Sequence, residues 1–164
     1  MEEFKYCPMC ASSLREEHIE GRNRLVCSEC GWINYLNPLP VITCLVSNPQ
    51  EELLLIKRGV EPCQGCWALP GGFIERQETI QEAGRRELEE ETGLKGEPGR
   101  LVGAHVHESP LYGSIVVLGM EFAITDGKIT VGDDASDAKF FPRNELPEIP
   151  FKSHIALINE FLPA

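Results

Sequence analysis

GFIERQETIQEAGRRELEEETGL, residues 72–94, is the stretch of sequence that decides the fold. Within it, Thr79 and Glu82 match a capping box, in which each side chain accepts a hydrogen bond from the other residue's backbone N–H at a helix start. Gly93 is suited to the left-handed conformation that commonly ends a helix. The pattern therefore predicts a helix of about thirteen residues between Thr79 and Gly93.

One face of this helix changes from apolar to acidic along its length. At about 100° per residue, a single stripe holds Ile80, Ala83, Gly84, Glu87 and Glu91, with Glu90 beside it. Repulsion between neighbouring carboxylates destabilises a helix by a few tenths of a kcal/mol per pair. A divalent cation bound by these carboxylates would turn this destabilisation into stabilisation. Mg²⁺ commonly binds carboxylates together with phosphate oxygens. The alternative is an acidic face that is merely solvated, the usual outcome for a Glu-rich helix.

The spacing of the residues around this helix favours the metal-binding interpretation over the solvated one. From Gly72 the chain has five residues, Glu78, seven residues and then Arg86-Glu87-Leu88-Glu89-Glu90-Glu91-Thr92-Gly93-Leu94. This resembles the Nudix box at every defined position. The resemblance implies an α/β (α+β) fold class with a mixed sheet layered between helices. It also implies a pyrophosphohydrolase in which a metal assists the attack of water on phosphorus.

The resemblance also implies roles for individual residues. Glu87, Glu90 and Glu91 correspond to ligands of a catalytic Mg²⁺ or Mn²⁺, which would polarise phosphorus and lower the pKa of a bound water. Arg86 and Glu78 correspond to the pair that holds the loop against the helix. At Gly71 or Gly72 the backbone would approach the metal, as a residue without a side chain allows.

A further metal ligand is expected from outside the box, because many members of the family supply one more carboxylate. Asp134 is the best source, and a charged surface loop is an equally good interpretation of its segment. Among residues outside the motif, Arg58 could bind phosphate or ribose oxygens, or be a solvated charge. Trp67 precedes Gly71 closely enough to stack on a nucleobase, although most aromatic residues are core.

Four cysteines near the N-terminus have metal-ligand spacing. Two Cys-x-x-Cys pairs, separated by sixteen residues, fit a two-knuckle zinc ribbon, in which four thiolates close a structural Zn²⁺ site; the ligands would be Cys7, Cys10, Cys27 and Cys30. Two disulfides are the alternative, which a reducing cytoplasm disfavours. Because the composition changes near Asn37, we expect a zinc ribbon in residues 1–36 and a Nudix domain in residues 37–164.

A zinc ribbon ahead of a Nudix box resembles NADH pyrophosphatases and the related FAD and ADP-ribose pyrophosphatases. We therefore expect hydrolysis of a nucleoside-diphosphate derivative of the FAD, ADP-ribose or NADH class to two monophosphates. The Ser-Gln-Pro-Trp signature of NADH pyrophosphatases is absent after the box, which disfavours NADH itself. Pro110 lies about where ADP-ribose pyrophosphatases have a proline. The alternatives are a nucleoside triphosphate pyrophosphohydrolase, an RNA-cap hydrolase, and a non-catalytic nucleotide-binding regulator.

Composition limits the partners and the compartment. The formal net charge of −11 argues against general nucleic-acid binding, which needs clustered Lys and Arg. No apolar run is long enough for a membrane span and the first residues do not resemble a signal peptide, so we expect a cytoplasmic protein. The family resemblance is compatible with a homodimer. The third pair, Cys63 and Cys66, is expected to be two ordinary thiols, because no second pair completes a metal site.

The remaining elements follow from local patterns. Residues 41–46 and 53–56 predict a hairpin that turns at residues 48–50. Further strands are expected at residues 101–107, 115–124 and 138–141, with Asp126-Gly127 as a hairpin turn. Residues 153–161 predict a C-terminal helix.

Overall fold

The computed structural model describes residues 4–132 and 134–162, and the chain divides into two compact units between Pro38 and Leu39. The first unit is a small antiparallel sheet of strands in the order β1-β2-β3, whose bounds are β1 Leu14–Ile19, β2 Arg22–Cys27 and β3 Ile33–Asn34. Its buried side chains include two of the cysteines, Cys7 and Cys27. So small an apolar interior is typical of a unit that depends on a metal to fold.

The second unit contains two sheets and two main helices. A four-stranded mixed sheet has the order β7-β4-β9-β8, and a three-stranded antiparallel sheet has the order β10-β5-β6. The strands are β4 Leu39–Leu45, β5 Leu53–Arg58, β6 Trp67–Ala68, β7 Gly71–Phe73, β8 Leu94–Ser109, β9 Gly113–Gly127 and β10 Ala135–Phe141. The helices are α1 Ile80–Thr92, the short 3₁₀ helix η1 Arg143–Glu145 and α2 Lys152–Phe161. This is the expected mixed architecture.

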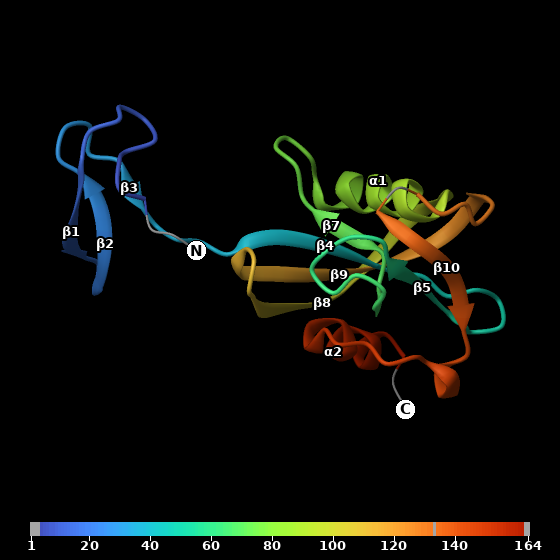
Figure 1. Cartoon of the computed structure of the whole chain (residues 1–164). Helices are drawn as coiled ribbons and strands as arrows, with labels where there is room; N and C mark the ends of the chain where they lie inside the picture. The colour runs from blue at the N-terminus through green and yellow to red at the C-terminus, as the bar shows by residue number, and fades with distance from the viewer. Residues whose placement is uncertain (1–3, 133, 163–164) are drawn as a thin grey trace. The chain divides into compact units, whose positions relative to one another are not determined.

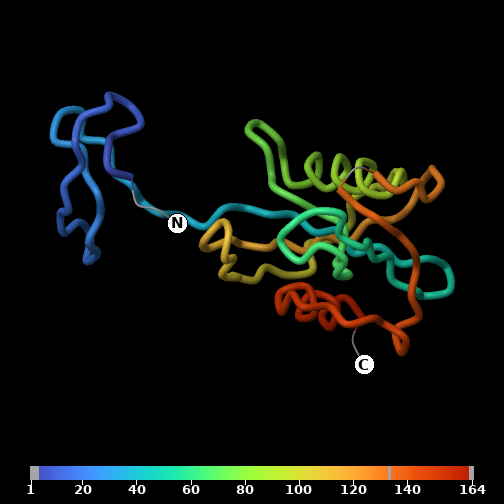
Figure 2. The backbone as a smooth tube through the Cα atoms, in the orientation of Figure 1, coloured from blue at the N-terminus to red at the C-terminus, as the bar shows by residue number. Residues whose placement is uncertain are grey.

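Helices α1 and α2 lie on opposite sides of the four-stranded sheet, as the ribbon and the backbone trace both show (Figures 1 and 2), and an apolar layer lies on each side. On the α1 side, Leu88 packs in one cluster with Ile42 and Cys44 of β4. On the α2 side, Leu157 packs in a second cluster with Leu45. Successive side chains of a strand point to opposite faces, so β4 contributes to both layers and is buried on both.

Helix α1 begins and ends where the sequence predicts. The Thr79 hydroxyl accepts a hydrogen bond from the Glu82 N–H, and the Glu82 carboxylate accepts one from the Thr79 N–H, which completes the capping box. Gly93 has φ 70° and donates its N–H to the Glu89 carbonyl at 2.8 Å. Within the described residues, no helix is long and apolar enough to cross a membrane.

Two expectations about turns were wrong. Residues 41–46 and 53–56 do not form a hairpin, because β7 and β9 occupy both sides of β4, and β5 pairs with β10 and β6 instead. The chain still reverses after β4, through one bridge between Ser47 and Leu53. Asp126-Gly127 is not a hairpin turn either, because Gly127 pairs with Leu94 at the end of β9. The β8–β9 reversal lies between Ser109 and Gly113.

Substitution of Gly84 in α1 tests how closely the helix packs on the sheet. A Cβ at this position would lie 2.4 Å from Phe122 Cζ, and Phe122 is fully buried. Leu favours a helix over Gly by less than about 1 kcal/mol, whereas overpacking costs about 1–3 kcal/mol. We expect Gly84→Leu to lower the free energy of unfolding in urea by roughly 1 kcal/mol or more. Gln81→Leu, at an exposed position of α1, is the matched control, and equal stability of the two variants would contradict this packing.

Candidate functional site

Arg86 connects the loop after β7 with the acidic face of α1. Its guanidinium donates two hydrogen bonds to the Glu78 carboxylate, at 2.7 and 2.9 Å, and one to the Phe73 carbonyl at 3.0 Å. It also donates to Glu87 at 2.6 Å and to Glu90 at 3.1 Å. The paired hydrogen bonds from Arg86 lower the pKa of Glu78 to about 2. The expected loop-supporting pair is therefore formed, and its cation also faces two box carboxylates.

Glu91 is a buried carboxylate with a backbone partner. Glu91 is only 7% exposed, and its Oε2 accepts a hydrogen bond from the Gly71 N–H at 2.7 Å. Burial raises the pKa of Glu91 to about 8, against the lowering effect of the Gly71 hydrogen bond. Burial also raises the pKa of Glu87, against the lowering effect of Arg86. Their raised pKa values show that the charged form of each carboxylate is disfavoured by burial, and a cation bound beside them would offset that cost.

The glycine pair of β7 makes room for these carboxylates. Gly71 has φ 148°, and a Cβ there would lie 2.1 Å from the Ile42 carbonyl oxygen. A Cβ on Gly72 would lie 2.5 Å from the Glu87 carboxylate. Only residues without side chains allow Gly71 to lie this close to β4 and Gly72 to lie this close to α1. Gly72 therefore lies against the Glu87 carboxylate, and Gly71 contacts Glu91 through its N–H; the expected approach of this backbone to a metal stays a prediction.

Asp134, which follows the box in sequence, lines the same cavity as Glu87 and Glu91. Its backbone carbonyl accepts the Gly59 N–H at 2.8 Å, at the end of β5. Its charge is one of the influences that raise the pKa of Glu91. Glu87, Glu91 and Asp134 all line one cavity of about 340 Å³. Asp134 is exposed in the turn before β10, so the surface-loop interpretation fits its position as well as the ligand interpretation does.

The cavity extends from the carboxylates to Arg58 and to a group of aromatic side chains. The Arg58 guanidinium donates to the Pro62 carbonyl at 2.7 Å and lies 5.9 Å from the Phe151 ring. Phe73 and Tyr112 pack edge to face at 4.9 Å, and both also line the cavity. Acidic groups at one part of the cavity and aromatic rings with a cation at another suit a ligand that carries both phosphates and a flat ring.

Some predicted residues lie elsewhere. Trp67 does not line the cavity; its ring packs on Phe141 at 4.8 Å and under the Lys139 ammonium, which makes it part of the core next to α2. Glu90 is 60% exposed and contacts Arg86 at the rim. Phe151 and His154 of the cavity wall were not predicted, because they follow the box by some sixty residues and no local pattern connects them with it.

The carboxylates offer the hard oxygen donors that Mg²⁺ or Mn²⁺ takes. In the described part of the chain, however, the four N-terminal cysteines are the only group whose ligand atoms lie close enough together to bind one metal ion. The Arg86 guanidinium occupies the position between Glu87 and Glu90 that a cation would share. The donor set fits a divalent metal, and the Arg86 contacts show that this face already holds positive charge.

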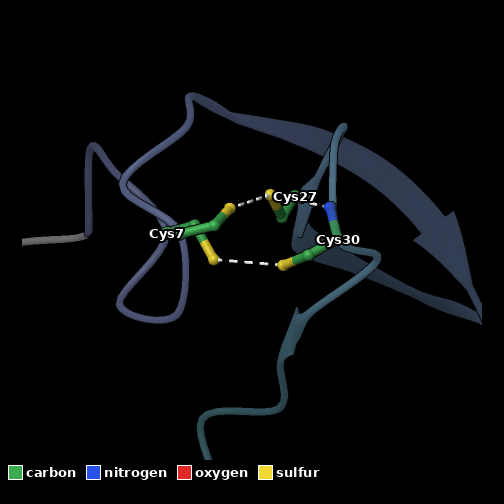
Figure 3. Close-up of side chains that lie close together, drawn as sticks. Cys7, Cys27 and Cys30 are labelled. Carbon is green, nitrogen blue, oxygen red and sulfur yellow. Dashed lines mark hydrogen bonds between the residues drawn. The ribbon is translucent and has the colours of Figure 1, made fainter.

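The four cysteines of the first unit fit a tetrahedral zinc site. Their ligand atoms all lie within 4.8 Å of one another, and the close pairs are Cys7 to Cys30 at 3.6 Å and Cys10 to Cys27 at 3.4 Å. Figure 3 shows the labelled side chains pointing toward one another. Sulfurs about 2.3 Å from a central zinc would be about 3.8 Å apart. All four are free cysteines, so the disulfide alternative is not realised.

The expectation of two ordinary thiols at Cys63 and Cys66 was wrong, because the two residues form a disulfide. A turn in which the Cys66 N–H donates to the Cys63 carbonyl at 3.1 Å brings the two side chains together. Cys44 remains a free thiol, fully buried beneath α1, and contacts the Gly84 carbonyl at 3.3 Å.

Comparisons with known proteins agree with this geometry. Residues 37–161 match the NUDIX domain family, and residues 5–36 match the Nudix N-terminal zinc-ribbon family. An ADP-ribose pyrophosphatase of Methanocaldococcus jannaschii is 37% identical over 131 residues, which cover 78% of this chain and 75% of that protein. The NAD-capped RNA hydrolase NudC of Stutzerimonas stutzeri is 24% identical, covering 94% of this chain but 54% of that protein.

A solved structure supports the same assignment. A NUDIX hydrolase from Nitrosomonas europaea superposes with a TM-score of 0.81 and is 27% identical, with 94% of this chain and 88% of that chain covered. Apart from the archaeal protein, the curated relatives considered are longer, and this chain spans between a third and about half of their length.

The contact between Glu78 and Arg86 predicts a pH-dependent stability. Because the pKa of Glu78 is lowered from 4.5 to about 2 in the folded protein, the ionised carboxylate stabilises the fold above pH 4.5, and this contribution is lost as the pH falls toward 2. We expect Glu78→Gln to lower the thermal midpoint at pH 7 and to differ less from wild type at pH 3. Circular dichroism melts measure both.

Glu75→Gln is the control for this experiment, because Glu75 is exposed on the same loop and donates only its backbone N–H to Glu78. A Glu78→Gln effect that stays constant between pH 7 and 3 would show that the ion pair is not its cause.

Proposed function

Because the chain belongs to the Nudix hydrolase family, we propose that it hydrolyses the pyrophosphate linkage of a nucleoside-diphosphate derivative of the ADP-ribose class, releasing two monophosphates. The observation that carries the proposal is the single cavity lined by Glu87, Glu91 and Asp134 and continued by Arg58 and aromatic rings. It can hold a pyrophosphate beside the carboxylates with a nucleoside against the aromatic wall. The archaeal ADP-ribose pyrophosphatase relative and the absent NADH signature both favour ADP-ribose.

The proposed metal ligands are Glu87, Glu90, Glu91 and Asp134. A Mg²⁺ or Mn²⁺ bound there would supply positive charge to the phosphate oxygens and make a coordinated water acidic enough to attack phosphorus. For Glu90 this requires a change of partner, since Arg86 holds its carboxylate at the rim. The Arg86 side chain keeps two strong hydrogen bonds to Glu78 in either case, so the loop and α1 remain joined.

The chain's own groups position the reaction. The Gly71 N–H fixes the orientation of the Glu91 carboxylate, and Gly72 lets the Glu87 carboxylate lie directly against β7. Arg58, held by the Pro62 carbonyl, is placed to neutralise phosphate oxygens that extend past the carboxylates. Fixing these groups before the substrate binds reduces the entropy lost on reaching the reactive geometry.

The first unit has a separate, structural role in this proposal. We infer that Zn²⁺ occupies the site of Cys7, Cys10, Cys27 and Cys30, because four thiolates leave no coordination position for water or substrate. The metal would provide the folding free energy that so small an apolar interior does not.

The carboxylate proposal predicts a large loss of activity in Glu91→Gln. The amide keeps an oxygen for the Gly71 N–H but loses the charge that binds the cation, so we expect kcat for Mg²⁺-dependent ADP-ribose hydrolysis to fall at least about a hundredfold. Separation of the products by chromatography should give AMP and ribose 5-phosphate from the wild type.

Glu89→Gln is the matched control. Glu89 lies on the same helix but pairs with Lys95 at 3.3 Å on its exposed side, so its activity should stay within about twofold of wild type. Release of inorganic pyrophosphate from nucleoside triphosphates, with ADP-ribose untouched, would instead identify a triphosphate pyrophosphohydrolase. Equal activity of Glu91→Gln and wild type would reject the assigned ligands.

Zinc binding has its own test. The purified protein should contain about one equivalent of Zn²⁺, and Cys10→Ser should lose most of it, because three thiolates bind the ion much more weakly than four. Atomic absorption measures the content. Cys44→Ala, which removes the buried free thiol of the other unit, should keep its zinc. A wild type without zinc, or a Cys10→Ser variant that retains it, would contradict the site.

A further inference from the structure

His154 lies in the first turn of α2 and lines the same cavity as the box carboxylates. Its Nδ1 is 3.1 Å from the backbone nitrogen of Leu69. A backbone N–H only donates, so Nδ1 must accept with its lone pair. In a neutral imidazole the proton then resides on Nε2. The Leu69 amide therefore fixes one tautomer of this ring.

The surroundings of the ring keep it neutral. Burial lowers the pKa of His154 to about 3, and the Arg58 cation and His107 lower it further. The Phe151 ring lies 5.1 Å from the His154 ring and covers one side of it. At neutral pH the side chain is consequently an uncharged ring with a single N–H donor.

That donor has no partner within the protein. Among residues 4–132 and 134–162, no acceptor bonds to His154 Nε2. The nitrogen is also not sealed in the interior, because the one buried side-chain nitrogen or oxygen without a partner in those residues is Arg24 Nε. A polar donor fixed in place and open to a ligand cavity is expected to meet an acceptor on the ligand.

Neighbouring groups indicate which part of the ligand this is. Arg58 influences the pKa of both Glu91 and His154, so its charge is within electrostatic range of the carboxylates and of the histidine. Phosphates would be bound by the carboxylate-held metal and by Arg58. The His154 donor is uncharged and its ring lies beside the Phe151 ring, which suits the uncharged oxygens and nitrogens of a sugar or base.

Resting on the proposed function, we propose that His154 determines substrate specificity by donating its Nε2–H to an uncharged acceptor of the nucleoside part of the substrate. The Leu69 amide acts through His154, as the group that orients it. A neutral hydrogen bond of this kind contributes to ground state and transition state alike, so its loss should raise KM about 2- to 13-fold and leave kcat nearly unchanged.

Two substitutions separate this role from a structural one. His154→Asn places an amide oxygen near the Nδ1 position, so it keeps an acceptor for Leu69 but loses the distal donor. His154→Gln extends an amide N–H₂ to about the Nε2 position, so it keeps the donor and loses the acceptor. If His154 served only to accept the Leu69 N–H, His154→Asn would preserve substrate affinity and His154→Gln would not. The proposal expects the reverse.

The measurements are KM and kcat for ADP-ribose with Mg²⁺, Kd for ADP-ribose by calorimetry with Ca²⁺ in place of Mg²⁺, and a thermal melt of each variant. We expect His154→Asn to raise KM and Kd together while its melting temperature stays near wild type, and His154→Gln to recover most of the affinity. A Gln variant no tighter than the Asn variant, or an Asn variant with wild-type affinity, overturns the proposal.

Measuring binding and hydrolysis separately also distinguishes this inference from the proposed function. A wild type that binds ADP-ribose without hydrolysing it rejects the pyrophosphohydrolase activity, while the Kd values of the variants still decide the role of His154. A wild type that neither binds nor hydrolyses ADP-ribose rejects both. Nitrogen-15 spectra of the ring provide a third readout, since a proton found on Nδ1 at pH 7 would overturn the tautomer on which the inference rests.

Discussion

The acidic face of α1 depends on the compensation of its negative charge. Glu87 and Glu91 lie one turn apart and are largely withdrawn from water, where like charges repel more strongly than on a surface. Arg86 and the Gly71 N–H are the groups that offset this repulsion in the protein itself. Because Arg86 also binds Glu78 and the Phe73 carbonyl, the same cation that stabilises the carboxylates fixes the loop in front of them. Site and fold are therefore stabilised by one contact.

This arrangement explains how α1 can be a core helix and also present an acidic face to the cavity. Ala83 and Leu88 bury their side chains against β4 and β9, and this packing supplies the free energy that holds the helix in place. Gly84 allows Phe122 to approach the helix. With its position fixed by apolar contacts, the helix can present carboxylates that would destabilise an isolated peptide.

Local patterns predicted the parts of the structure that are locally determined. The capping box, the left-handed Gly93 and the spacing of Arg86 from Glu78 each depend on residues close in sequence, and the structure has all three. The partners of β5 were not predictable in this way, because they depend on which strands already occupy the sides of β4. The same holds for the far wall of the cavity. Phe151 and His154 reach it only because α2 packs beneath the sheet, and neither residue belongs to a motif.

The charge of the cavity limits how a phosphate-bearing ligand can bind. The whole chain carries a formal charge of −11, and five acidic residues line the cavity, against Arg58 as the single Lys or Arg in its described lining. Such a field repels pyrophosphate, and a divalent cation bound near Glu87 and Glu91, as proposed, would reverse its sign there. Affinity for the phosphates would then be set by the metal, which does not distinguish one nucleotide from another. Discrimination between nucleotides would then come from uncharged contacts in the cavity, where a fixed donor such as His154 Nε2–H would reject ligands that lack an acceptor at the matching position.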